Sequence, residues 1–598
     1  MLNVIKEIFS LLSNEQRKRF YILQILVILM ALTELLGIAS IAPFMALVGN
    51  MSLLEEDGIY SKIYQFSGIS NPLNFLFISG IGVLVALTVS TVVSMFTTWR
   101  LSLYGSSVGV QLADRLYSHY MQQDWQFHAN GSSAQLIKQV STESARISNG
   151  IIQPLMQMNA KVVLAILIAI GILIYDPIVA IAGLLMFVTG YLLMYKLVRK
   201  ALIVNGRRLS SVATNRFRLM NEGFGGIKDV LLLDRNADFI NRFSIEGDVQ
   251  AKAQGLNQTI SQVPRFFIEL LAFGAMIGLV LILIKTHHGN LGTVLPILAV
   301  YALACFKLLP ALQQIYSSIT TIKGNIAAFE SVKDDLINSQ EELSTRKTVA
   351  SNKFSLTKQI TLSNIYFSYP NKNIYAVNDV SISIPVNHVI GIVGSSGSGK
   401  STLIDIILGL LTPQKGEIYV DDTLIIDNNK RGWQDLLGFV PQSIFLSEGS
   451  IAENVAFGIP AHDINYDQVM RAVDLAHLTE LVNELPESIH TKVGERGVQL
   501  SGGQRQRIGI ARALYNEADI LIFDEATSAL DGITEKIIMD AIHEFSGKKT
   551  IIMIAHRLKT VQKCDTIYLM EKGRVIDQGT YQQLVNKNPK FREMAKHS

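Results

Sequence analysis

Cysteine is nearly absent from this chain of 598 residues, which has only Cys305 and Cys564. The two lie far apart, one in an apolar run and the other in a soluble-looking region, so neither a disulfide framework nor a cysteine metal cluster is predicted. Charge of one sign is also scarce, because 53 Lys and Arg nearly balance 50 Asp and Glu and leave a net charge of +3. Without a global basic field, nucleic acid is not expected as a partner.

Charged residues are few overall, at 17% of the chain, whereas 49% of residues are hydrophobic and the mean hydropathy is +0.30. The chain is too apolar for a soluble enzyme and too charged to consist only of membrane helices, so two different parts are predicted. The first apolar run begins near Phe20 and is too long for the core of a signal peptide. We expect it to be retained as an anchor.

The first part holds apolar stretches long enough to cross a bilayer, which takes about 20 residues each. We count six, the third of which reaches this length when extended back through Ile151–Met158. They are Tyr21–Val48, Phe75–Phe96, Val162–Tyr175, Ile178–Val198, Phe266–Ile284 and Leu291–Leu309. An even number of spans places both ends of the chain on one side.

Lys and Arg concentrate before the first span and after the fourth, which makes those sides cytoplasmic. The loop between the first two spans is acidic, with Glu55, Glu56 and Asp57. A multi-pass protein of the inner membrane is predicted, with its N-terminus and its second part in the cytoplasm. The connections at about 97–149 and 199–265 look like helical extensions of the spans, with tips near Asp124–His128 and Asn221–Asp229.

After about Lys347 the pattern changes to short β-branched runs that alternate with amphipathic stretches, which is typical of a parallel-sheet nucleotide-binding domain. The predicted fold class is therefore multidomain: an all-α transmembrane domain of six long helices fused to an α/β P-loop domain. We place the membrane domain at 1–330, a polar linker at 331–351 and the second domain at 352–598.

A glycine-rich loop follows the apolar strand Val389–Val393 and precedes a helix, the context that a P-loop requires. Its glycines let backbone N–H groups surround phosphate oxygens, Lys400 offsets phosphate charge, and the Ser401 hydroxyl suits Mg²⁺. The predicted phosphate-binding residues are Gly394, Ser395, Ser396, Gly397, Ser398, Gly399, Lys400, Ser401 and Thr402.

A second apolar strand, Ile520–Phe523, ends in two carboxylates. This is a Walker B arrangement, in which Asp524 would hold Mg²⁺ and Glu525 would orient or deprotonate the attacking water. A buried strand with an acidic end is common by itself, but the preceding P-loop favours the catalytic interpretation.

Between these two motifs stand Leu500, Ser501, Gly502, Gly503 and Gln504. This run resembles the signature motif of the ABC ATPase family, and the resemblance extends from about Phe354 to the C-terminus. It implies an ATP hydrolase with ATP and Mg²⁺ as cofactors, and it assigns roles to four further residues: Tyr369 stacking on adenine, the Q-loop Gln442 as a catalytic and metal-linked group, Asp531 in the D-loop and His556 as the switch histidine.

A signature loop that faces a γ-phosphate must come from a second domain, because the P-loop already covers one side of the nucleotide. The family resemblance implies such a head-to-tail pair, and a chain with one ATPase domain then acts as a homodimer half-transporter. Thr491–Gly497 resembles the X-loop of exporters, which together with the fused domain order favours an exporter of the type IV fold.

Three segments of the membrane half resemble flippases of the PglK type, which move lipid-linked oligosaccharides: Gly37–Met45, Gly225–Val230 and the external loop Met51–Pro72. Since charges at membrane depth are costly and usually face a cavity, Arg265 and Lys307, with Arg100 as a third cation, are candidates to contact the diphosphate of a polyprenyl-linked sugar. Ordinary pairing of Arg265 with Glu269 one turn away is the alternative.

Two other functions remain open at this point. The chain could export lipid A, a drug or a peptide, or it could be a gated channel or regulator on the same architecture. Channels and regulators of this kind often lose catalytic residues, so the presence of Glu525 and His556 favours active hydrolysis.

Overall fold

The computed structural model describes residues 2–49, 51–55, 58–175, 177–286, 291–345, 354–370, 372, 374–494, 497, 500–525, 536, 539, 544–555 and 557–596. The chain divides into two compact units. One holds Met1–Gln123 and Phe127–Arg346, and the other holds Lys347–Ser598 together with Asp124–Gln126, at the first of the two predicted cytoplasmic tips.

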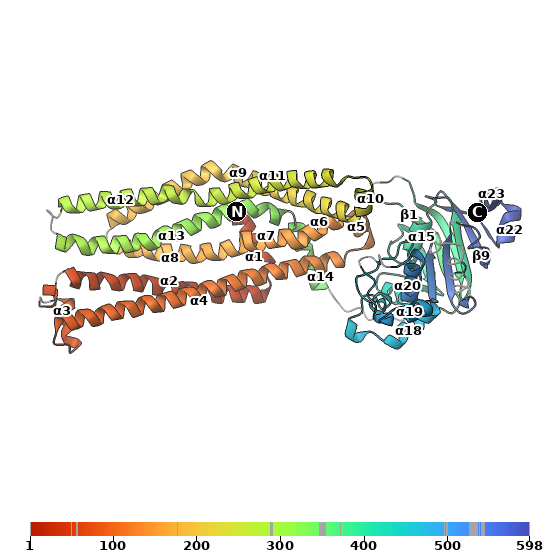
Figure 1. The fold of residues 1–598 in the computed structure, drawn as a ribbon, viewed down its shortest axis with the longest axis horizontal. Helices are drawn as coiled ribbons and strands as arrows, with labels where there is room; N and C mark the ends of the chain where they lie inside the picture. The colour runs from red at the N-terminus through yellow and green to blue at the C-terminus, as the bar shows by residue number, and fades with distance from the viewer. Residues whose placement is uncertain are drawn as a thin grey trace. The chain divides into compact units, whose positions relative to one another are not determined.

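Every regular element described in the first 345 residues is helical (Figure 1). The α-helices are α1 (Leu2–Leu11), α2 (Asn14–Gly49), α3 (Ile59–Phe66), α4 (Pro72–Met121), α5 (Trp125–Asn130), α6 (Ser133–Lys138), α7 (Ser144–Ile147), α8 (Gln153–Tyr175), α9 (Pro177–Gly225), α10 (Ile227–Leu232), α11 (Asn236–Gln262), α12 (Pro264–Thr286), α13 (Leu291–Glu330) and α14 (Lys333–Thr345).

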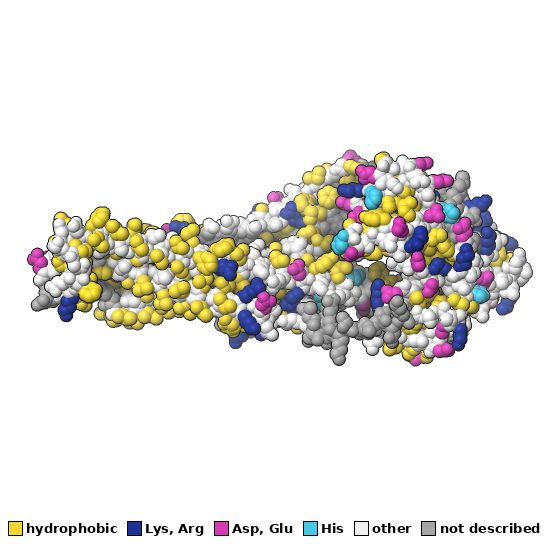
Figure 2. All heavy atoms as spheres, turned by 90° about the horizontal axis from the view of Figure 1, so that it is seen from below, with side chains coloured by type: hydrophobic (Ala, Val, Ile, Leu, Met, Phe, Trp, Pro, Cys, Tyr) yellow, Lys and Arg dark blue, Asp and Glu magenta, His cyan; other side chains and the backbone are white. Residues whose placement is uncertain are grey.

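Among the described residues, five helical segments are long and apolar enough to cross a membrane. They are Asn14–Gly49, Pro72–Met121, Ser133–Ile174, Ala180–Gly225 and Asn236–Gly278. The predicted sixth span falls in α13, where most side chains between 291 and 300 lie outside the described residues. Figure 2 shows hydrophobic side chains as a broad zone over these helices, with Lys and Arg gathered where the zone ends.

The spans continue as helices beyond the apolar zone, as predicted for the connections. From Ser133 to Tyr175 the chain is helical throughout, with π-helical turns at Gln139–Glu143 and Ser148–Ile152. Gly206 on α9 packs so closely on α13 that a Cβ there would lie 2.4 Å from the Gly324 carbonyl oxygen. Only glycine allows this approach of the two backbones.

A buried ion cluster joins three of these helices. The fully buried Glu143 carboxylate lies 2.9 Å from the Arg146 guanidinium and 3.3 Å from the Lys138 ammonium. Arg146 also donates to Ser210 Oγ on α9 at 2.7 Å and to Asn325 Oδ1 on α13 at 3.2 Å. Both cations are thus partnered inside the protein, as buried charges require.

Part of the stretch predicted as a linker is a helix. α14 packs against α4, where Arg115 donates to the Leu336 carbonyl and to Ser339 Oγ, each at 3.1 Å. The Leu336 side chain is fully buried. The stretch was predicted as a linker because it is mostly polar, although it includes this apolar residue at the contact with α4.

The second unit holds two β-sheets (Figure 1). The four-stranded sheet has the order β2-β1-β4-β5 and the six-stranded sheet the order β10-β9-β3-β8-β7-β6. The strands are β1 (Gln359–Phe367), β2 (Val377–Pro385), β3 (Val389–Gly394), β4 (Lys415–Val420), β5 (Thr423–Leu424), β6 (Leu437–Val440), β7 (Ile520–Asp524), β8 (Thr550–Ala555), β9 (Thr566–Glu571) and β10 (Arg574–Gly579).

The helices of this unit pack on the six-stranded sheet, in which β9, β3, β8, β7 and β6 are parallel. They are α15 (Lys400–Ile407), α16 (Lys430–Gln434), α17 (Ile451–Val455), α18 (Tyr466–Leu475), α19 (Thr479–Glu484), α20 (Gly502–Tyr515), α22 (Tyr581–Lys587) and α23 (Pro589–Lys596). The combination of a helical membrane unit with this α/β unit confirms the predicted fold class.

The two faces of that sheet carry different helices. Val389, Val393 and Phe523 point into a core shared with α17, α18 and α20. Ile390 and Ile522, one residue along each strand, point into a second core shared with α15 and the four-stranded sheet. Because side chains alternate along a strand, α15 and α20 lie on opposite faces of the sheet.

Candidate nucleotide site and membrane cations

The predicted phosphate-binding loop joins β3 to α15. β3 is buried along its whole length between β8 and β9, so the loop leaves the carboxyl end of a central parallel strand. Gly399 has φ +98, and a Cβ there would lie 2.2 Å from the Ala376 carbonyl oxygen. A side chain at this position would break the loop geometry. Crevices at the carboxyl ends of such strands are where ligands bind in α/β folds.

Lys400 lies at the start of α15 with its ammonium turned into the loop. Nζ donates to the carbonyl oxygens of Gly394 at 2.9 Å and Ser395 at 3.0 Å. Burial lowers the pKa of Lys400, and the charges of Glu525 and Asp524 act in the opposite direction. The Ser398 hydroxyl of the same loop is buried and has no hydrogen-bond partner among the residues that the structure describes. The loop therefore presents one enclosed cation and one unused hydroxyl.

Asp524 ends β7 and Glu525 follows it directly. Glu525 has φ +50, a left-handed conformation that is uncommon outside glycine. Its Oε2 accepts a hydrogen bond from Gln442 Nε2 at 2.6 Å. Gln442 follows β6, which pairs in parallel with β7. Adjacent parallel strands thus bring together the predicted Q-loop and Walker B residues.

Tyr369 lies at the side of the loop. Its hydroxyl is 3.2 Å from Thr402 Oγ1 on α15, and its ring packs edge-on against Phe367. The Lys372 ammonium lies 5.8 Å from the centre of the Tyr369 ring. An aromatic face beside a phosphate loop can hold a planar base by stacking.

The predicted signature residues begin α20. Ser501 is its N-cap: Oγ accepts from the Gln504 N–H at 3.2 Å, and Gln504 Oε1 accepts from the Ser501 N–H at 2.8 Å. This capping box satisfies two polar groups and leaves the backbone around the exposed Gly502 open to a ligand. The free N–H groups at such a helix start attract anions. The motif therefore has the form of a second phosphate contact, on the opposite face of the sheet from α15.

The three cations predicted for the membrane half have separate surroundings. Arg265 Nε lies 2.5 Å from Glu269 Oε1, the local pairing considered above, and the Arg265 side chain is 52% exposed. Lys307 Nζ on α13 lies 3.5 Å from Glu34 Oε2 on α2, and Glu34, 6% exposed, also accepts from Ser94 Oγ at 2.7 Å. Arg100 lies over the Phe96 ring.

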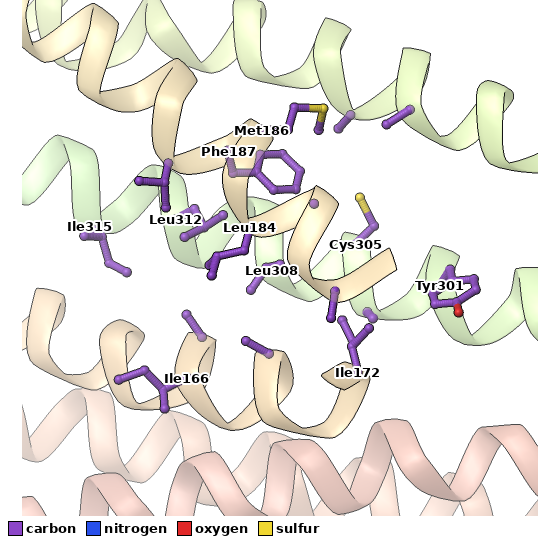
Figure 3. A pocket seen from close by; sticks show the side chains of 18 of the residues that line it. Ile166, Ile172, Leu184, Met186, Phe187, Tyr301, Cys305, Leu308, Leu312 and Ile315 are labelled. Carbon is purple, nitrogen blue, oxygen red and sulfur yellow. The ribbon is translucent and has the colours of Figure 1, made fainter. Parts of the chain in front are cut away.

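An apolar cavity of about 330 Å³ lies within the membrane unit (Figure 3). Side chains from α8, α9 and α13 converge on it, together with residues of α12, and none of the described residues that line it is charged. Labelled in the figure are Ile166, Ile172, Leu184, Met186, Phe187, Tyr301, Cys305, Leu308, Leu312 and Ile315. Such a lining suits a hydrocarbon chain.

Both halves of the chain match families of known proteins. The profile described as "ABC transporter" matches residues 377–528, and the one described as "ABC transporter transmembrane region" matches residues 21–306. The chain is a member of the ABC transporter family. Its fold is that of a solved bacterial Atm1-family ABC exporter with ATP bound, with a TM-score of 0.77 at 21% identity over 97% of this chain and 99% of that one. It is an ABC exporter, and its second unit is the ATP hydrolase coupled to translocation.

Curated relatives of this exporter carry differing names. An ATP-dependent lipid A-core flippase of Pseudoalteromonas atlantica is 28% identical over 83% of this chain and 84% of its own length. The heterocyst differentiation ATP-binding protein HepA of Nostoc is 29% identical over 82% of this chain and 79% of its own length. A toxin RTX-I translocation ATP-binding protein of Actinobacillus pleuropneumoniae is 46% identical, but over only 38% of this chain and 32% of its own length.

The donor set of the ATPase site fits Mg²⁺. Ser401 is exposed at the loop, and Asp524 and Gln442 stand at the ends of neighbouring strands. Hydroxyl, carboxylate and amide oxygens are ligands that Mg²⁺ accepts. Two predicted site residues, His556 and Asp531, lie outside the described residues, as do Glu495 and Arg496 of the X-loop.

Asp405 on α15 was not among the predicted site residues. Burial, followed by the charge of Asp524, raises the pKa of Asp405 on α15 to about 6. The available signal was a lone carboxylate among the apolar residues Leu403, Ile404, Ile406 and Ile407. Polarity inside an otherwise apolar helix next to a P-loop indicates an electrostatic role.

Proposed function

We propose that the exporter is a homodimer with two shared ATP sites and that it flips a polyprenyl-diphosphate-linked oligosaccharide across the inner membrane. In each site the P-loop of one chain and the signature residues of the other would hold the same nucleotide. The observation that carries the dimer is that α15 and α20 lie on opposite faces of the six-stranded sheet. A phosphate held by α15 is thereby separated from the signature of the same chain by a buried layer of β-strands.

Each side chain then has a defined task in hydrolysis. Lys400 would exchange its loop carbonyl partners for phosphate oxygens, which offer a charge-assisted hydrogen bond. Tyr369 would stack on adenine, and Ser501 and Gly502 would contact the γ-phosphate. Mg²⁺, held by Ser401, Asp524 and Gln442, would offset the charge of the phosphates.

Glu525 would orient the attacking water and accept its proton. Its bond to Gln442 supports this role, because Gln442 fixes one carboxylate oxygen and leaves the other for water. When the two chains close around nucleotide, the Q-loop residue Gln442 would move with Glu525, which links hydrolysis to movement of the membrane helices.

Mixed dimers test the shared sites. Lys400→Ala disables a P-loop and Ser501→Glu disables a signature, so each variant alone should be inactive in a homodimer. When the two variants are co-expressed, about half of the dimers should be mixed. Each mixed dimer has one site with both defects and one intact site. The mixture should therefore recover up to about a quarter of the wild-type ATPase rate. If P-loop and signature act within one chain, the mixture stays inactive.

The lipid substrate is supported by features of the membrane unit. The apolar cavity suits a prenyl chain, and the exposed Arg265 and Lys307 suit a diphosphate. The predicted external loop is in part a helix, α3, whose Tyr60 and Tyr64 pack on the domain while Ile59 and Phe66 stay exposed. An exposed apolar face of this kind can lie on the outer leaflet.

A lipid A-type glycolipid is the second candidate, favoured by the names of several relatives. Both lipids join phosphate, sugar and hydrocarbon, so both suit this membrane unit. Purified exporter in proteoliposomes should show ATPase stimulation and leaflet exchange of a fluorescent polyprenyl-diphosphate oligosaccharide but not of a lipid A analogue. The reverse result would replace the first candidate by the second.

A further inference from the structure

A pocket of about 330 Å³ lies between α2 and α4. Apart from Arg100, considered above as a third cation for the diphosphate, none of its lining residues has a task in the proposed function. Its walls are mainly apolar, but they also include two arginines and a chain of hydrogen-bonded side chains. Gln16 on α2 donates to Gln111 on α4, and Gln111 donates to Ser107 Oγ at 3.3 Å. The Tyr104 hydroxyl donates to the Gln16 carbonyl oxygen at 3.1 Å. The pocket is thus a preformed concavity that joins two helices, with polar side chains set among apolar ones.

The two arginines, Arg19 and Arg100, give the pocket a positive charge. The Arg19 guanidinium forms an ion pair with the exposed Glu15 carboxylate, with Nη2 and Oε1 2.6 Å apart. Arg100 has no carboxylate within ion-pair distance in the part of the chain that the structure describes, and its guanidinium lies 5.9 Å from the Phe96 ring centre. A guanidinium without a carboxylate partner at the wall of a pocket is suited to bind a phosphate through paired N–H groups.

The pocket lies at the depth of lipid headgroups. Arg19 precedes the first apolar run and Arg100 lies shortly after the second, on the side that the distribution of Lys and Arg makes cytoplasmic. Tyr21, at the start of the first run, and Trp99, after the end of the second, are 59% and 56% exposed. Exposed Tyr and Trp rings at the ends of spans mark the membrane–water interface.

An apolar side chain of α2 lines the pocket on its membrane side. Ile22, one turn into the first apolar run from Arg19, is 65% exposed, so it can contact acyl chains in the bilayer. A free phosphate or nucleotide would leave Ile22 unused, whereas a phospholipid would contact both the arginines and this side chain. We propose that this pocket binds the phosphate of an anionic phospholipid of the cytoplasmic leaflet, distinct from the transported lipid.

Lipid binding to the full-length exporter in mild detergent tests the proposal, with bound phosphatidylglycerol counted by native mass spectrometry. Arg19→Gln and Arg100→Gln should each weaken retention about fivefold, and the double variant on the order of 25-fold. Lys18→Gln is the matched control, because Lys18 is an exposed neighbour that does not line the pocket. It should change retention less than either arginine variant does.

Two additional measurements separate the sources of phosphate. Inorganic phosphate at millimolar concentration should not displace phosphatidylglycerol, and zwitterionic phosphatidylcholine should be retained more weakly.

An unchanged melting temperature of the double variant in lipid-free detergent shows that it is folded. Arg100→Lys keeps the positive charge and should restore part of the phosphatidylglycerol retention.

Three results would overturn the proposal. The first is a loss of phosphatidylglycerol retention in Lys18→Gln as large as that in the arginine variants, which would indicate general electrostatic attraction to the basic surface. The second is full displacement by inorganic phosphate. The third is retention of a polyprenyl-diphosphate lipid alone, with no phosphatidylglycerol bound, which makes the pocket an entry point for cargo.

Discussion

The Glu525 side chain is held in place from two directions. Its backbone has the left-handed φ of +50, which costs on the order of 1–3 kcal/mol outside glycine, and its carboxylate accepts from Gln442 at 2.6 Å. Backbone outliers of this kind persist where the surroundings enforce them, which is frequent at active sites. The strain supports a catalytic task for Glu525 independently of the sequence motif.

Replacing Glu525 by Gln should separate ATP binding from hydrolysis. The amide keeps the size of the side chain but cannot accept a proton, so turnover should fall about 10²- to 10⁴-fold while ATP still binds. Steady-state ATPase rates and binding of a fluorescent ATP analogue measure the two effects. A variant that hydrolyses ATP at the wild-type rate would remove Glu525 from this role.

Asp405 should make the nucleotide-free exporter more stable in mild acid. Its folded pKa of about 6 lies above its ordinary value of 3.8, so the folded state binds the proton more tightly. The cost of the buried charge is therefore present above pH 6 and is relieved as pH falls from about 6 to 4.

Asp405→Asn should remove this cost. The melting temperature of the variant in detergent with EDTA should exceed that of the wild type at pH 7.5, and the difference should shrink at pH 5. Asp422→Asn, at a largely exposed position, is the matched control and should show no such pH dependence. A constant difference at both pH values would contradict the electrostatic explanation.

At the scale of elements, the P-loop and the Walker B strand were predictable because each is a local strand, loop and helix pattern. The contact between Gln442 and Glu525 was not predictable from spacing, because it requires β6 to pair with β7 across 83 positions of the chain. α14 was missed for a similar reason: its partner Arg115 is more than 200 positions away.

The capping boxes allow a controlled test of the signature helix. Ser501 caps α20, and Thr580 caps α22 with the same reciprocal bonds. Each change to Ala should cost about 1 kcal/mol of local stability. Only Ser501→Ala should also lower the ATPase rate, since Ser501 is proposed to meet the nucleotide of the partner chain. Equal ATPase rates in the two variants would reduce Ser501 to a structural cap.

The buried carboxylate of Glu143 should be needed for the packing of the membrane unit. Glu143→Ala leaves Lys138 and Arg146 buried without their anion, which costs about 3–5 kcal/mol in comparable pairs. Thermal unfolding in detergent measures this loss. Glu7→Ala, which breaks the more exposed pair with Lys333, should cost far less.

For the whole molecule, the membrane cations are predicted to act on cargo and not on ATP. Arg265→Ala combined with Lys307→Ala should abolish flipping of a lipid-diphosphate substrate while basal ATPase activity survives. Leaflet-accessibility assays in proteoliposomes measure flipping. Glu269→Ala, which removes the ion-pair partner of Arg265, is the matched variant and should retain flipping. Unimpaired flipping in the double variant would rule out the cation role.

The alternation of side chains across the six-stranded sheet has a consequence for inhibition. A binder that covers only the exposed start of α20 would leave the nucleotide pocket of its own chain untouched. In the proposed homodimer it would nevertheless stop turnover at the pocket of the neighbouring subunit. An antibody fragment against this short surface should therefore block the exporter without competing with nucleotide for its primary binding loop.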